Sequence, residues 1–182
     1  MDSSVDSHSK SSGSFGQLPL QGPHSHVQDP LHSDKSLNNE QIEEDMEDVP
    51  GFLGVFPHDE ISTIIPKEGD SLIINLENHT LPGSHWIPFY FSSTDAIYCD
   101  SYGVPPDDRS FKLLGKYGKD IQYSEKQIQE DCSTECGYYS MAIIRMLQSG
   151  MTLEEALAEF TPEPSQKNEE LVLDITEDAS GS

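Results

Sequence analysis

The first half of the foldable chain contains short runs rich in apolar and β-branched residues between turns, a pattern that predicts β-strands. The expected strands are Ser71–Glu77, His85–Phe91 and Ala96–Gly103, with shorter extended pieces at Phe52–Phe56, Ser62–Ile65 and Ile121–Tyr123. The strands that begin at His85 and Ala96 flank a Ser-Ser-Thr-Asp turn, so we expect them to be antiparallel neighbours. Pro88 has no N–H to donate to a ladder, and we therefore expect it at an edge or a bulge.

Two helices are expected outside the central segment, one before the predicted strands and one after most of them. Asn38 and Gln41 form a capping-box pattern at the start of a short helix. A second helix follows Pro105-Pro106, with Phe111 and Leu114 turned toward the core. Its other side carries four cations, Arg109, Lys112, Lys116 and Lys119. The simpler interpretation of that basic side is a solvated helix face.

The segment Cys136–Gln148 is apolar on nearly every face, which is typical of a helix buried in the middle of a domain. Thr152 and Glu155 then form a capping-box pattern and begin a last helix that runs to Phe160. Together these elements predict an α/β (α+β) domain in which a central buried helix packs on a small mixed, mostly antiparallel sheet.

The ends of the chain differ in composition from this predicted domain, which spans residues 37–163. Residues 1–36 are polar and lack an apolar period, so we expect them to be disordered. Their four histidines include a His-x-His pair, but no cluster that would complete a metal site. Residues 164–182 form an acidic tail with one apolar patch, Leu171–Ile175, that can dock.

Composition narrows the class of protein. The chain has 182 residues, enough for one domain, and 10 Lys+Arg against 33 Asp+Glu give a net charge of −23. That charge argues against binding polyanions such as DNA over the whole surface. The odd number of cysteines, three, and the lack of an apolar run after Met1 predict a reducing, intracellular compartment. No segment has the length and apolar character of a membrane span, and we expect a monomer.

The candidate chemistry is that of a nucleophilic cysteine. Cys136 lies where a loop becomes the central helix, and a helix N-terminus stabilises a thiolate. His85 is placed to act as the base, and Asp100, one strand on, is placed to fix its tautomer. The Gln129 amide and the Cys136 backbone N–H are candidates for an oxyanion hole. Taken singly, each residue has a simpler interpretation, such as a buried cysteine or a turn aspartate; the combination and order favour catalysis.

Three segments resemble the signature blocks of adenovirus-type cysteine proteases, most closely those of Maverick/Polinton transposons and related viruses. They are PGSHW (Pro82–Trp86), YCDSYGVPP (Tyr98–Pro106) and IQ…STECGYY (Ile128–Tyr139). The resemblance implies a papain-like fold and assigns His85, Asp100, Gln129 and Cys136 as catalytic residues without a cofactor or metal. It also implies polypeptide substrates, such as capsid precursors, cleaved after small residues such as Gly. Adenovirus has Glu where this chain has Asp100, and its basic, DNA-activated enzyme differs from this acidic chain.

Three further residues near these blocks carry expectations. Trp86 is a lid over a narrow substrate cleft, as the resemblance to SUMO proteases implies, a core aromatic, or both. Gly137 is expected to let the substrate backbone come close. Cys132, four residues before Cys136, is either a packing residue or a resolving thiol that protects the nucleophile from over-oxidation.

Two other functions remain open from the sequence. Deconjugases of ubiquitin-like modifiers share the His-Trp, Asp, Gln and Cys-Gly set, although they usually carry Asp where this chain has Glu135 and place Gln one position closer to Cys. A catalytically silent descendant acting as an acidic binding or scaffold protein is the alternative outside enzymes.

Overall fold

The computed structural model describes residues 37–76 and 85–180. The chain separates into two units, Met1–Ser33 and Asp34–Ser182, and every described residue belongs to the second. The predicted disordered segment 1–36 lies outside the described residues.

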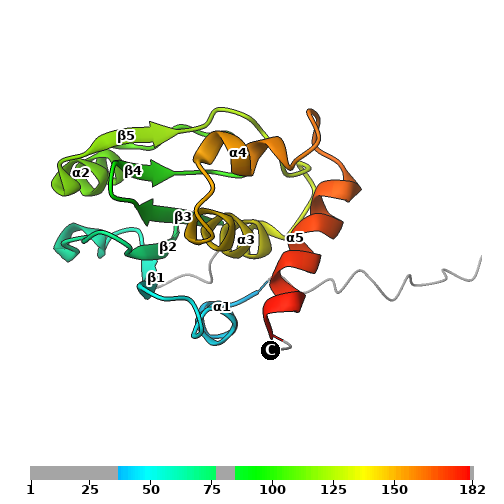
Figure 1. Ribbon diagram of the computed structural model, residues 1–182, viewed down its shortest axis with the longest axis horizontal. Coiled ribbons are helices and arrows are strands. Elements are labelled where there is room, and N and C mark those ends of the chain that lie inside the picture. Colours follow the sequence, from blue (N-terminus) through cyan, green and yellow to red (C-terminus); the bar gives the residue numbers. More distant parts are fainter. Residues whose placement is uncertain (1–36, 77–84, 181–182) are drawn as a thin grey trace, which may run out of the picture. The chain divides into compact units, whose positions relative to one another are not determined.

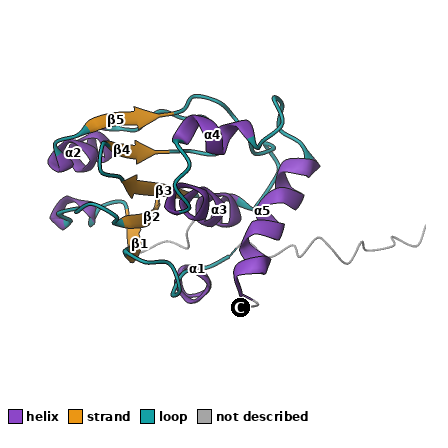
Figure 2. Ribbon diagram, viewed as in Figure 1, coloured by secondary structure: helices purple, strands orange, loops and turns teal. Residues whose placement is uncertain are grey.

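A five-stranded mixed sheet forms the centre of the domain, with its strands in chain order (Figures 1 and 2). The strands are β1 (Phe52–Pro57), β2 (Ser71–Asn75), β3 (Trp86–Phe91), β4 (Asp95–Tyr98) and β5 (Asp120–Tyr123). The β2–β3 and β3–β4 pairs are antiparallel, whereas the outer β1–β2 and β4–β5 pairs are parallel. The predicted mixed sheet is confirmed, with its antiparallel pairings confined to the three middle strands.

Helices pack on both faces of the sheet because its middle strands are apolar on both sides. On one face lies α3 (Cys136–Gln148), which packs against β3 and Ile73 of β2. On the other, Leu72 and Ile74 of β2 join Leu113 and Leu114 of α2 (Asp108–Tyr117) in a separate apolar cluster. Most residues of α3 are buried, as its uniformly apolar sequence predicts.

The two predicted capping boxes are present. In α1 (Asn39–Asp45) the Asn38 side chain accepts from the Gln41 N–H while the Gln41 side chain accepts from the Asn38 N–H. In α4 (Leu153–Ala158) Thr152 and Glu155 make the same exchange. No helix within the described ranges is long and apolar enough to span a membrane.

Pro88 is not at an edge or a bulge, contrary to expectation, but in β3, the middle strand. It lies opposite Ile73, at a position whose backbone does not bond toward β2. On that side the Phe91 N–H donates to the Asp70 carbonyl and the His85 carbonyl accepts from the Leu76 N–H, and antiparallel bonding alternates, so position 88 is skipped. The missing N–H therefore faces β4. There the regular pairing begins at Phe89, and Pro88 still takes part through its carbonyl, which accepts from the Cys99 N–H at 3.4 Å. The missing donor thus falls at the end of the ladder, where its loss is limited to one terminal bond.

The packed domain extends past the predicted boundary at residue 163. Residues 166–180 form the helix α5 (Gln166–Ser180), which lies alongside α3 in Figure 1. The apolar patch Leu171–Ile175 docks on the core, with Val172 fully buried. Of its acidic residues, Glu170, Asp174 and Glu177 are exposed, whereas Glu169 is buried.

Two smaller expectations about local structure are wrong. The expected extended piece at Ser62–Ile65 overlaps a 3₁₀ turn, η1 (Ile61–Thr63), whose Ile61 is the buried residue. Phe111 does not enter the core: it is 38 % exposed and packs edge-on against Tyr123 of β5, while Leu113 takes the buried position.

Candidate active site

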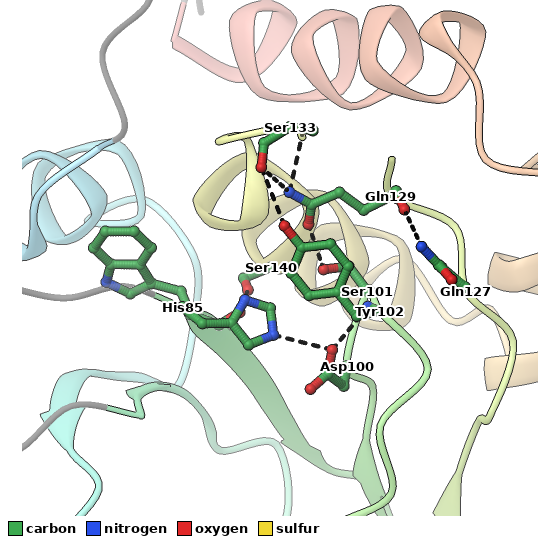
Figure 3. Close-up of polar contacts among 9 residues, drawn as sticks. His85, Asp100, Ser101, Tyr102, Gln127, Gln129, Ser133 and Ser140 are labelled. Carbon is green, nitrogen blue, oxygen red and sulfur yellow. Dashed lines mark hydrogen bonds and ion pairs between the residues drawn. The ribbon is translucent and has the colours of Figure 1, made fainter. Parts of the chain in front are cut away.

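His85 and Asp100 are brought together by the sheet. His85 immediately precedes β3 and its carbonyl accepts from the Leu76 N–H, which continues the β2–β3 ladder. Asp100 lies two residues beyond the end of β4. The His85 Nε2 lies 3.0 Å from the Asp100 Oδ1, and both side chains are buried (Figure 3). A carboxylate there fixes the imidazole ring and its tautomer.

A tight turn holds the Asp100 carboxylate in place. The Tyr102 N–H donates to Asp100 Oδ1 at 2.8 Å, and the Gly103 N–H donates to the Asp100 carbonyl. Gly103 has a φ of 72°, and a Cβ there would lie 2.6 Å from the Glu125 carbonyl oxygen. The simpler interpretation of Asp100 as a turn residue is therefore correct and also compatible with a role beside His85.

Cys136 is the first residue of α3 and is almost fully buried. Burial by itself lowers the pKa of His85, but hydrogen bonding to Asp100 and Cys136 and the charges of both groups outweigh it and raise the pKa to about 9. A protonated imidazole near neutral pH is the partner that a thiolate at a helix N-terminus requires.

The two imidazole nitrogens face different groups. Because Nε2 contacts Asp100, Nδ1 is the nitrogen left for the thiol, and it is buried without a well-formed hydrogen bond to any described residue. The Cys136 thiol nevertheless raises the pKa of His85, which is the effect of a hydrogen bond between the two groups. Such bonds are often long in a free enzyme and tighten with substrate.

Gln129 is fully buried and bonded at both ends of its amide. Its Oε1 accepts from the Ser101 hydroxyl at 2.6 Å, and its Nε2 donates to the carbonyl and hydroxyl of Ser133 at 3.1 and 3.2 Å. Figure 3 shows the amide directed at Ser133. In this state the amide donors contact the loop that leads to Cys136, not open space.

Trp86 is a core aromatic, one of the two interpretations that the sequence allowed. It is 2 % exposed, clusters with Cys136 and residues of α1, and donates its indole N–H to Asn39 Oδ1. Gly137 also meets α1: a Cβ there would lie 3.1 Å from Leu37 Cδ1 and 3.3 Å from Ile42 Cδ1. The absence of a side chain at Gly137 therefore lets α3 pack closely against Leu37 and Ile42. Whether Gly137 also lies close to a substrate stays a prediction.

Ser101, Tyr102 and Ser133 join the site without having been singled out from the sequence. The Tyr102 ring lies 4.9 Å from the His85 ring, and its hydroxyl donates to the Ser133 carbonyl at 3.1 Å. Desolvation, followed by the nearby negative charges, raises the pKa of Tyr102 to about 12, so it remains a donor. Adjacency to Asp100 and Cys136 was the only sequence signal for these residues.

All three cysteines are free thiols: Cys99 and Cys136 are buried, and Cys132 is exposed. The two roles of Cys132 stay predictions. Within residues 37–76 and 85–180, no cluster of His, Cys, Asp and Glu is arranged to hold a metal. His8, His24, His26 and His32 lie outside the described residues.

Comparison with known proteins gives a likeness of fold. No family model and no curated protein matches the sequence. The structure is similar to the crystal structure of the ASFV pS273R protease, with a TM-score of 0.53 and 12 % identity over 76 % of this chain and 63 % of that chain. A crystal structure of the selenomethionine form matches with a TM-score of 0.44 and 16 % identity over 58 % and 43 %. This chain thus covers less than two thirds of the viral protease and shares its fold.

Proposed function

We propose that this protein is a cysteine endopeptidase that hydrolyses peptide bonds through a thioester acyl-enzyme. The observation that carries the proposal is the 3.0 Å contact of His85 Nε2 with Asp100, which leaves the buried Nδ1 for Cys136 at the start of α3. Nucleophile, base and orienting carboxylate thus occur in the order that thiol hydrolysis requires. The fold shared with the ASFV pS273R protease is consistent with it.

In the proposed reaction His85 holds the proton of the Cys136 thiol, and the thiolate attacks the scissile carbonyl carbon. The C–N bond then breaks as His85 gives its proton to the leaving amine, and a thioester remains on Cys136. His85 next removes a proton from water, which attacks the thioester and releases the acid product and the thiol.

The developing oxyanion is stabilised by the Cys136 backbone N–H and the Gln129 amide. In the free protein both Gln129 donors contact Ser133, whose hydroxyl itself donates to the Glu135 carboxylate. An oxyanion is a stronger acceptor than a neutral hydroxyl. We propose that it replaces the Ser133 hydroxyl as the partner of one Gln129 N–H.

The resemblance to adenovirus-type proteases supports a finer assignment. We propose cleavage after small residues such as Gly in viral or transposon capsid precursors, in an intracellular setting. DNA activation is not expected. Three of the four cations lie on α2, and Lys119 follows it. Arg109 donates to the His58 carbonyl and Lys116 to the carbonyls of Ser62 and Ile64, so these two are engaged within the protein.

The decisive test is labelling of the full-length protein with a Gly-terminated peptide vinyl sulfone, followed by identification of the modified cysteine. We expect modification of Cys136, complete loss of labelling in Cys136→Ala and His85→Ala, and full labelling in the matched variant Cys132→Ala. Labelling that survives Cys136→Ala would place the nucleophile elsewhere.

A parallel reaction with a ubiquitin-like vinyl sulfone separates the two enzyme classes. Preference for the ubiquitin-like probe would favour a deconjugase. A wild-type protein that reacts with neither probe and hydrolyses no peptide would favour the silent binding protein.

A further inference from the structure

We infer that Ser101 is a positioning residue for catalysis: its hydroxyl holds the Gln129 amide in the orientation that an oxyanion donor needs. The inference rests on the proposed function and adds a residue that neither the sequence pattern nor the resemblance assigned. It is carried by the buried 2.6 Å bond from Ser101 Oγ to Gln129 Oε1.

The chemistry of the partners fixes the direction of the amide. The Ser133 carbonyl can only accept, so the amide end that contacts it at 3.1 Å must be Nε2. Oε1 then faces Ser101, whose hydroxyl must be the donor. This is the one hydrogen bond that the described residues give to Oε1. Loss of the hydroxyl would leave a fully buried amide oxygen without a donor.

The backbone of Ser101 also holds Gln129 in place. Its carbonyl accepts from the N–H groups of both Ile128 and Gln129, at 2.8 and 3.1 Å. Side chain and main chain of Ser101 therefore locate Gln129 together, and Ser101 is itself fixed because it follows Asp100.

Three consecutive residues thus arrange both sides of the reaction. Asp100 orients the base, Ser101 orients the oxyanion amide, and Tyr102 packs on the His85 ring and bonds the Ser133 carbonyl. Asp100 acts on proton transfer, whereas Ser101 acts on stabilisation of the oxyanion. The two effects can therefore be measured separately.

The experiment compares hydrolysis of a fluorogenic peptide by wild type, Ser101→Ala, Gln129→Ala and the double variant. We expect Ser101→Ala to lower kcat about tenfold with little change in KM, and Gln129→Ala to lower it by about a hundredfold or more. In the Gln129→Ala background, Ser101→Ala should lower kcat no further, because the group that it positions is absent. Ser101→Thr, which keeps a hydroxyl, should recover most of the activity.

Two controls separate positioning from a general structural effect. Alkylation of Cys136 by iodoacetamide passes through no oxyanion, so its rate and pH profile should be unchanged in Ser101→Ala. Ser71→Ala, which removes another buried serine hydroxyl that has no partner among the described residues, should leave kcat unchanged.

The outcomes distinguish this inference from the proposed function. If the wild-type protein hydrolyses the peptide, three results would overturn the role of Ser101 alone. They are an unchanged kcat in Ser101→Ala, additive losses of kcat in the double variant, and slower alkylation of Cys136 in Ser101→Ala. No hydrolysis by the wild-type protein, or hydrolysis that survives Cys136→Ala, would overturn the proposed function and this inference with it.

Discussion

His85 and Asp100 are placed by the sheet, whereas Gln129 is placed by single hydrogen bonds from residues outside the sheet, to its backbone and to its side-chain amide. The backbones beside His85 and Asp100 belong to ladders or continue them, so many hydrogen bonds fix this pair. Gln129 lies in the segment between β5 and α3, where Ser101, Ser133 and Asn168 hold it or its neighbour Ile128. The two parts of the site meet at the start of α3.

This difference has consequences for stability and for motion. A ladder distributes its stabilisation over several bonds, so one substitution seldom releases a residue. A side chain held by single bonds depends on each partner, and each such bond contributes on the order of 1 kcal/mol. We therefore expect the geometry of the His85–Asp100 pair to be little affected by substitutions around it. The position of Gln129 should instead depend on single partners, including residues distant from it in the sequence.

The largest expected loss of activity comes from removing the negative charge of Asp100 while keeping the size of its side chain. Asp100→Asn should lower kcat by about three orders of magnitude or more, since an amide no longer favours the required tautomer and protonated form of His85. Thermal denaturation should show a folded protein. Turnover close to wild type would mean that Asp100 is only a turn residue, and Asp95 would then need the same test.

A second effect follows from the pKa of His85, which burial lowers but Asp100 and Cys136 raise from 6.5 to about 9. Because the folded value lies above the unfolded one, this histidine stabilises the fold fully below pH 6.5, and its contribution is lost as the pH rises through about 9. Urea unfolding of wild type and His85→Ala across that window should show their difference in free energy shrinking by on the order of 1–3 kcal/mol. The kcat/KM of wild type should also fall above about pH 9. A pH-independent difference would contradict the assignment.

The loop-held part can be weakened from α5. Asn168 is buried, donates to the Ile128 carbonyl at 2.9 Å and accepts from the Thr161 N–H at 2.9 Å. Asn168→Ala should lower Tm by about 4–8 °C and kcat by several-fold, because Ile128 precedes Gln129, the proposed oxyanion donor. The exposed Asp174 of the same helix provides the matched control, and Asp174→Ala should change neither value. Equal effects of the two substitutions would show that α5 does not support the site in this way.

The smallest effect is expected at Gly137, on the helix that joins the two parts. A Cβ there would crowd Leu37 and Ile42 by only a few tenths of an ångström, and both contacts are with side-chain atoms. The better helix propensity of alanine offsets part of that cost, so Gly137→Ala should change the unfolding free energy by about 1 kcal/mol or less. Activity should remain near wild type. A large rise in KM at unchanged Tm would instead support contact of Gly137 with substrate.

Local patterns alone predicted several elements. The uniformly apolar run predicted α3 with the bounds that the structure has, and the capping-box residues predicted where α1 and α4 begin. These features depend on neighbours within about four residues, which the sequence shows directly. The contact between His85 and Asp100 was also predicted, because a tight turn between two strands makes these residues neighbours.

Contacts between distant segments were decided by the tertiary structure. Pro88 occupies a middle strand because its missing N–H faces the end of a ladder, a matter of register. The acidic stretch after residue 163 becomes a packed helix because α3 offers an apolar surface to Val172. Ser101 meets Gln129 across 28 positions of chain, and no local pattern marks that bond. Sequence patterns report which face of an element is apolar; only the folded chain determines what that face meets.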